Sequence, residues 1–364
     1  MNAAPSWGSH RTPDLSAYSG PICVTGGSGF IGSHVVGRLR DLGRDVRCLV
    51  LPSDPAPLLR GLDVTRVNGD LLDPNALDQA MEGCELVIPL AAIYALWLPD
   101  PSVMHRVNVD GTRCVMAAAK RAGVKRVIHT SSIAAIGNLP GITSADETTP
   151  FDEWDIADDY VISKHLSEQE ALRPEHLDAL DVVVVNPAFP FGARDISPTP
   201  TGKLILAMMR GLLPFVADGG FNGVHVRDVA EGHLLAVDKG RSGERYLLAG
   251  HNLTYKAFAK RVAAITGGPD ETISLPRDLL VRMGTVAELG ATLVRRAPLF
   301  THKSLAYAAG RYLYFKTDKA EAELGYAPSP LEDALKDAIA WFESPESPHD
   351  IRPLRARLRG ALPL

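Results

Sequence analysis

The feature that most constrains this chain is a glycine-rich turn between a short apolar strand and a helix. An apolar run at 21–24 leads into the turn 25–32, and apolar residues at helical spacing follow over 33–42. A pyrophosphate needs backbone N–H groups aimed at it and no side chains in its way, and glycine supplies both conditions. Because strand, turn and helix stand in the required order, the segment predicts a dinucleotide phosphate site, with a tight structural turn as the alternative.

The first half of the chain alternates strand and helix patterns. Strands are predicted at 46–51, 64–68, 86–90, 126–130 and 182–185, and helices at 76–82, 103–122 and 160–172. Strands separated by helices imply βαβ units and a parallel sheet with helices on both faces. The predicted fold class is therefore α/β, a Rossmann doubly wound parallel sheet, in which ligands bind at the carboxyl ends of the strands.

This rhythm ends after residue 187. A loop rich in proline and phenylalanine spans 187–200, and further elements are predicted at 201–212, 223–238, 253–267, 277–297 and 330–342. We expect a dinucleotide-binding domain at 21–187, to which 223–250 returns. The segments 188–222 and 251–345 should form a smaller, mostly helical C-terminal substrate lobe. Residues 1–20 are expected to be a flexible leader and 346–364 a basic tail.

Composition narrows the class of protein. The 364 residues are 46% hydrophobic and 22% charged, which is typical of a soluble globular enzyme, and the net charge of −5 gives no sign of nucleic-acid binding. No apolar stretch is long enough for a membrane span or a signal peptide, so we expect a cytoplasmic protein. The four cysteines are interpreted as buried, reduced thiols, and no metal site is expected.

The basic tail allows two interpretations. Arginines at 352, 355, 357 and 359 alternate with leucines, a pattern that suits an amphipathic helix touching a membrane surface. A solvated terminal helix or a frayed end is the favoured alternative.

A set of polar residues predicts the chemistry. Tyr160 and Lys164 are four apart on a predicted helix and share one face, and Ser132 closes a predicted strand. A nearby ammonium and an oxidised nicotinamide both favour the tyrosinate, so Tyr160 can exchange a proton with a carbonyl or hydroxyl oxygen. Ser132 can hold the same oxygen, and Lys164 can also bind the nicotinamide ribose.

These motifs resemble those of extended short-chain dehydrogenases/reductases of the NAD-dependent epimerase/dehydratase superfamily. The segments that carry the resemblance are 25–32, 69–71, 90–92, 108–112, 130–132 and 160–164. Within that family the chain is most similar to the dihydroflavonol-reductase-like branch and to hopanoid-associated sugar epimerases, through 96–110, 194–202 and 224–233. The resemblance covers about residues 22 to 342.

The resemblance implies a role for each matching residue. Ser132, Tyr160 and Lys164 match the catalytic residues, and Asn108 matches an asparagine that orders its helix and the proton relay, with a plain helix residue as the alternative. The residues expected to bind the cofactor are Gly26, Gly29, Phe30, Ile31, Gly32, Asp70, Leu71, Ala91, Ala92, Lys164 and Pro187. Asp70 would contact the adenine edge, and a simple turn residue is its alternative.

The cofactor itself stays open between NAD and NADP. An acidic residue at the end of the second strand selects NAD, and a nearby arginine accommodates NADP. Leu51 stands where relatives often have that arginine. Asp54 lies slightly late in the sequence, and Arg44 and Arg47 lie early.

Apolar residues dominate the expected substrate site. Tyr94, Trp97, Phe189 and Phe191 are predicted to line it, which suits an apolar or alicyclic small molecule, unless they only pack the two lobes together. Ile133 follows Ser132 where dehydratases carry an acidic residue, so water elimination is disfavoured.

The predicted function is therefore NAD(P)-dependent hydride transfer at a carbonyl or secondary alcohol carbon. A redox-neutral sugar epimerase with tightly bound NAD is the alternative, and a non-catalytic dinucleotide sensor is a third hypothesis. The resemblance also implies a homodimer that pairs the helices 103–122 and 160–172.

Overall fold

The computed structural model describes residues 12–213, 215–268, 273–294 and 300–351. Over these ranges the central sheet has seven strands in the order β10-β6-β5-β4-β1-β2-β3, and every pairing is parallel. The strands are β1 Ile22–Thr25, β2 Val46–Val50, β3 Thr65–Asn68, β4 Leu86–Pro89, β5 Arg126–Thr130, β6 Asp181–Pro187 and β10 Arg245–Leu248. The predicted Rossmann sheet is confirmed, and its chain order reverses between β1 and β4, where such sheets bind dinucleotides.

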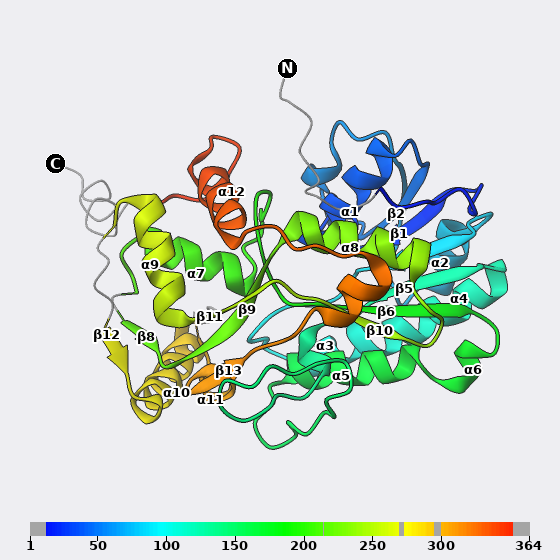
Figure 1. Cartoon of the computed structure of the whole chain (residues 1–364). Helices are drawn as coiled ribbons and strands as arrows, with labels where there is room; N and C mark the ends of the chain where they lie inside the picture. Colours follow the sequence, from blue (N-terminus) through cyan, green and yellow to red (C-terminus); the bar gives the residue numbers. More distant parts are fainter. Residues whose placement is uncertain (1–11, 214, 269–272, 295–299, 352–364) are drawn as a thin grey trace.

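Helices cover both faces of this sheet (Figure 1). One layer holds α1 Phe30–Asp41 and α8 Val226–Lys239, and the other holds α2 Pro74–Met81, α4 Gly111–Ala122 and α5 Asp159–Ala171. Alternate strand residues enter opposite cores: Ile22 and Val24 join one apolar cluster, and Cys23 between them joins the other. Strands buried on both faces explain why their sequences are apolar runs rather than alternating patterns.

The predicted helix at 103–122 is continuous but uneven. It comprises α3 Ser102–His105, a π-helical turn η2 over Arg106–Asp110 and then α4. Short elements complete this part of the chain: η1 Pro57–Leu59, η3 Ile133–Ala135 and α6 Pro174–Leu177.

The second lobe contains two small sheets as well as helices. One sheet has the order β11-β9-β13 with β7 also on β9, and the other pairs β12 with β8. Its strands are β7 Phe189–Phe191, β8 Phe215–Ala217, β9 Gly219–His225, β11 His251–Thr254, β12 Ile273–Leu275 and β13 Arg311–Leu313. Its helices are α7 Pro200–Met209, α9 Tyr255–Thr266, α10 Arg277–Val294, α11 His302–Ala308, η4 Ala320–Leu324 and α12 Leu331–Glu343. Most of these strands have only three or four residues, too few to show a period of two in the sequence.

Residues 12–20 differ from the expected flexible leader. Leu15 and Tyr18 are buried in the main core, and the Arg44 guanidinium donates to the carbonyl of Tyr18. The two apolar side chains stabilise this segment against the sheet domain, whose surface they cover. From residue 352 onward, the predicted basic tail lies outside the described residues. None of the described helices has the length and apolar character needed to cross a membrane.

Candidate active site

The glycine turn is shaped by close backbone contacts at the carboxyl end of β1. Gly26 has a positive φ of 68°, and a Cβ there would lie 2.5 Å from the Ala91 nitrogen. A Cβ on Gly32 would lie 2.1 Å from the Gly26 oxygen. Gly29 is the N-cap residue of α1 and has no side chain to cap the helix, which leaves the first N–H groups of the helix open for an anion. These residues fit the pyrophosphate of a dinucleotide.

The residues near β2 that could select NAD or NADP are Asp54, Arg44 and Arg47, and they make different contacts. Asp54 accepts a hydrogen bond of 2.6 Å from the hydroxyl of Ser28 within the glycine turn, while Leu51 is exposed. Arg47 donates to the Glu82 carbonyl at 2.7 Å, on the α2 side, and Arg44 holds the segment 12–20. Only Asp54 among these candidates therefore lies beside the glycine turn.

The other residues predicted to bind cofactor have different surroundings. The Ala91 nitrogen donates to the Thr25 hydroxyl at 3.2 Å, so Ala91 packs against β1. Asp70 is exposed and accepts from the Leu72 nitrogen at 2.9 Å, as a turn residue does. Leu71 is buried against Gly111. Phe30, Ile31, Ala92 and Pro187 line the cavity described below.

Ser132, Tyr160 and Lys164 converge beside that cavity. Ser132 caps η3 by accepting from the Ala134 nitrogen at 3.1 Å, and Lys164 donates from Nζ to the Thr130 carbonyl at 2.8 Å. Burial raises the pKa of Tyr160 to about 12, and its hydrogen bond with Ser132 acts in the opposite direction. Burial lowers the pKa of Lys164 to about 8, and the nearby Glu168 partly offsets that shift. Burial thus disfavours the charged form of each group relative to water, and Lys164 stays charged below its pKa of about 8.

A buried polar network supports the three residues from behind. The side chain of Asn186 donates from Nδ2 to the Ser132 carbonyl at 2.9 Å and to Glu168 at 2.6 Å. Arg245, on β10, forms an ion pair of 2.8 Å with the fully buried Glu168. The network was not predicted, because its members are far apart in sequence and none belongs to a recognisable motif.

Asn108 lies in the π-helical turn and acts on the backbone beside the site. Its amide donates to the Ile93 carbonyl at 3.1 Å and its oxygen accepts from the Ile93 nitrogen at 2.8 Å. The same amide donates to the Ser163 hydroxyl at 2.9 Å. Asn108 therefore joins the loop after β4 to α5, and its side chain forms no hydrogen bond with Tyr160 or Lys164.

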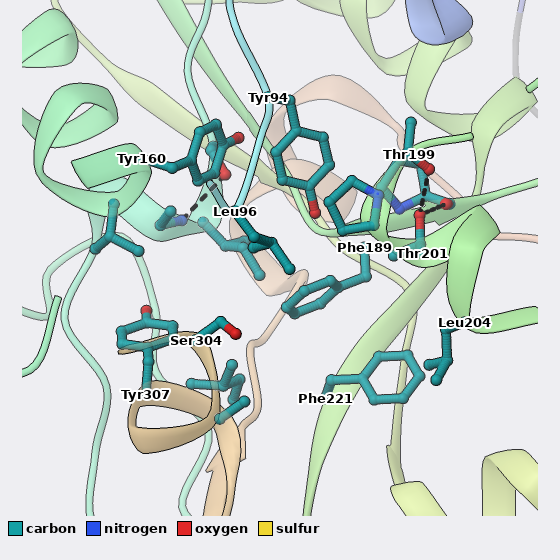
Figure 2. A pocket seen from close by; sticks show the side chains of 18 of the residues that line it. Tyr94, Leu96, Tyr160, Phe189, Thr199, Thr201, Leu204, Phe221, Ser304 and Tyr307 are labelled. Carbon is teal, nitrogen blue, oxygen red and sulfur yellow. Dashed lines mark hydrogen bonds between the residues drawn. The ribbon is translucent and has the colours of Figure 1, made fainter. Parts of the chain in front are cut away.

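A cavity of about 520 Å³ runs from the glycine turn past these residues into the second lobe. Figure 2 shows the rings of Tyr94 and Tyr160 side by side at one end, and Phe189 and Phe221 further along. The centroids of the two tyrosine rings are 4.6 Å apart. Within the described lining, the residues with a charged side chain are Asp158 and Lys164. The cavity is otherwise bounded mainly by apolar and aromatic groups.

The cavity includes three of the four residues predicted to contact substrate. Tyr94, Phe189 and Phe191 line it, and Trp97 does not, although its neighbour Leu96 does. Sequence reasoning missed the part of the lining that residues after 200 supply, which includes Leu204, Met208, Phe215, Phe221, Leu280, Met283, Ser304 and Tyr307. It also missed Asp158, which caps α5 through a 3.0 Å bond from the Val161 nitrogen and whose pKa is raised by burial. An acidic residue two positions before Tyr160 at a helix start was the available signal.

Known proteins share this architecture along most of the chain. The family model described as NAD dependent epimerase/dehydratase family matches residues 22–249. A Synechocystis sp. protein with the provisional name dihydroflavonol 4-reductase is 38% identical, over 88% of this chain and 94% of its own length. Sterol demethylase protein B of Methylococcus capsulatus is 34% identical, over 88% of this chain and 97% of its own.

A solved structure agrees with these relatives. The crystal structure of gox2253 is 40% identical to this chain, with a TM-score of 0.79 over 89% of this chain and 98% of its own. The chain therefore belongs to the NAD dependent epimerase/dehydratase family and is an enzyme of the extended short-chain dehydrogenase/reductase type.

Proposed function

We propose that this enzyme transfers a hydride between NAD and a secondary alcohol or ketone carbon on a large apolar, alicyclic substrate of sterol-like size. The observation that carries the proposal is the position of Ser132, Tyr160 and Lys164 along an apolar cavity of about 520 Å³ that begins at the glycine turn. The similarity to a sterol demethylase protein supports a polycyclic substrate. Apolar walls with few polar groups stabilise such a molecule by removing its surface from water.

The chain's own residues divide the work. NAD, when bound, supplies the hydride acceptor. Ser132 holds the substrate oxygen, and Tyr160 takes or returns the proton at that oxygen. Lys164 lies one helical turn from Tyr160, and its positive charge favours the tyrosinate that burial disfavours. Asn108, by fixing the backbone of Ile93, is a positioning residue for the loop that carries Tyr94.

A nucleotide sugar suits this cavity less well. A diphosphate is recognised by arginine or lysine side chains, and the described lining offers Lys164 as its cation. Epimerisation through a ketone would use the same Ser132 and Tyr160, so the sugar epimerase remains the second candidate. It differs in measurable ways, since it needs retained NAD and gives no net change in nicotinamide absorbance.

The test is turnover by the purified protein with NAD⁺ and a panel of secondary alcohols. Hydroxysteroids and other polycyclic alcohols should be oxidised, and nucleotide sugars should neither be oxidised nor epimerised. Tyr160→Phe removes the proton carrier and should lower kcat by about a thousandfold, within the range found for general acid–base groups. NAD binding should survive, since Tyr160 is not part of the glycine turn.

Tyr312→Phe is the matched control, because Tyr312 lies on β13 and outside the cavity lining. It should retain wild-type turnover. Equal turnover by Tyr160→Phe and the wild type would contradict the mechanism. Epimerised sugar without net redox change would favour the second candidate, and dinucleotide binding with no turnover of any substrate would favour a sensor.

The organisation around the site follows from the same proposal. The sheet domain at 21–187, completed by 223–250, would hold NAD, and the segments 188–222 and 251–345 would hold the substrate. A homodimer through α4 and α5 would cover Leu166 on α5, which is 36% exposed. We place the enzyme in the cytoplasm.

A further inference from the structure

Helix α10 presents an apolar stripe to solvent. Leu279, Met283, Val286 and Leu289 recur at spacings of four, three and three residues, which places them on one side of a helix. Their exposed fractions are 47%, 39%, 72% and 68%. An amphipathic helix normally buries such a stripe, so this one has no partner within the described part of the chain.

The opposite side of α10 is fixed against α11. A Cβ on Gly284 would lie 2.9 Å from Cδ1 of Leu305, so glycine allows the two helices to approach closely. Thr285 and His302 share a side-chain hydrogen bond of 3.0 Å, and Glu288 accepts from the His302 nitrogen at 3.1 Å. These contacts set the rotation of α10 and hold the stripe outward.

The stripe is continuous with the substrate cavity. Met283 belongs to both, and Leu280 and Ala287 on the same helix line the cavity. Exposed Ile273 lies on β12, whose partner strand β8 contributes Phe215 to the cavity wall. Figure 1 shows β8, β12, α10 and α11 together at one end of the molecule, away from the central sheet.

The positive side chain of Arg282 is exposed on this surface, and the exposed acidic residue of the first turn of α10 is Asp278. Arg277 instead donates to the Ala306 carbonyl on α11, and Lys303 belongs to α11 itself. Arg282 lies on the same helix face as Leu279 and Val286, where a long side chain can lie along apolar surface and keep its charge in a polar layer. A cation that lies along an apolar stripe complements an anionic lipid headgroup.

We propose that the α10 surface, defined by Leu279, Met283, Val286 and Leu289, docks on the surface of a lipid bilayer that contains anionic lipids. The stripe would enter the boundary between headgroups and acyl chains without spanning the membrane. The cavity would then open toward the bilayer, and a water-insoluble substrate could reach Tyr160 without crossing water. This substrate route rests on the proposed function, whereas the docking does not.

The experiment is flotation of the purified full chain with vesicles of phosphatidylcholine and phosphatidylglycerol in equal parts. The wild type should float with the vesicles, and more weakly with phosphatidylcholine alone. The double variant Val286→Asp/Leu289→Asp places two carboxylates in the stripe, so its vesicle dissociation constant should rise about tenfold or more. Leu72→Asp is the matched control, because Leu72 is also an exposed leucine but precedes α2 on the sheet domain.

Val286 and Leu289 do not line the cavity, so the double variant should turn over a small, soluble alcohol as the wild type does. The milder variant Val286→Ser should show an intermediate loss of flotation, which separates docking from misfolding. Wild-type protein that stays out of the vesicle fraction would overturn the proposal. The proposal would also fail if the double variant floated as well as the wild type. It would fail too if the wild type formed a dimer that the double substitution dissociates and did not bind vesicles. Flotation without turnover of any alcohol would contradict the proposed function and leave the docking supported.

Discussion

At the residue scale, Glu168 is a buried carboxylate one helical turn beyond Lys164. It accepts one hydrogen bond from Asn186 and pairs with Arg245, and its charge raises the pKa of Lys164 against the effect of burial. It touches no part of the cavity, so it is a positioning residue whose influence reaches the site through Lys164 and through the Ser132 carbonyl.

Glu168→Gln should therefore change the pH dependence of the enzyme. Lys164 is charged below its pKa of about 8, and loss of the carboxylate lowers that pKa further. In ketone reduction, kcat/KM should begin to fall at a lower pH than in the wild type. Removing one partner of a buried ion pair should also destabilise the fold by about 3 kcal/mol.

The matched control is Glu170→Gln, on the same helix but paired with Arg113 and remote from Lys164. It should leave the pH profile in place. A Glu168→Gln profile that coincides with the wild type, measured on protein shown by thermal melting to be folded, would refute a role for Glu168 in setting the charge of Lys164.

Asp54 gives a second prediction at this scale. Its carboxylate lies beside Ser28 of the glycine turn, and the exposed Leu51 provides no cation for a 2′-phosphate. NAD⁺ should therefore support a higher kcat/KM than NADP⁺. Asp54→Asn should lower the ratio of kcat/KM for NAD⁺ to that for NADP⁺ by about tenfold. It removes a carboxylate that would repel the 2′-phosphate, and like charges a few ångströms apart repel by about 1 kcal/mol or more. Asp63→Asn, at an exposed position paired with Arg40, should not change it. Equal use of both cofactors by the wild type would contradict this account.

At the scale of the element, helix α1 depends on the contact between Gly32 and the turn before it. Gly32→Ala would place a Cβ 2.1 Å from the Gly26 oxygen and 2.9 Å from Cα of Gly27, so the turn must move. We expect NAD affinity to fall by more than about tenfold and stability by about 1–3 kcal/mol.

Gly37→Ala on the same helix provides the control. A Cβ there meets nothing within 4 Å, and alanine is the better helix former by about 1 kcal/mol. That variant should bind NAD normally and melt no lower than the wild type. Titration with NAD and thermal unfolding measure both effects, and unchanged NAD affinity in Gly32→Ala would contradict the role given to the close approach.

At the scale of the whole molecule, segments from the second half of the chain pack against the sheet domain that the first half forms. Helix α8 packs beside α1, where Arg38 and the fully buried Glu231 form an ion pair of 2.7 Å. The loop after β7 also reaches the sheet domain: His34 on α1 hydrogen-bonds the Ala193 carbonyl at 2.9 Å, and Arg194 donates to the Leu58 carbonyl. The glycine turn and the apolar cavity, the proposed sites for NAD and substrate, are therefore held in one framework by contacts between distant segments.

The sequence by itself predicted the parallel sheet, the glycine turn and the grouping of Ser132, Tyr160 and Lys164. These features depend on local order: a strand before a turn, a helix after it, and two residues four apart on one helix. The same kind of evidence could not place Trp97 outside the cavity lining, or Leu15 and Tyr18 in the core. Those outcomes depend on which surfaces meet.

Only the tertiary structure decided how the site is supported and enclosed. Glu168, Asn186 and Arg245 come from three separate elements, and their hydrogen bonds exist only once α5, β6 and β10 are adjacent. The spacing of apolar residues shows that α10 has a stripe, but a helix has no inside or outside until its neighbours are in place. The stripe faces solvent because the other side of α10 packs against α11, where Gly284 lets the two helices approach closely.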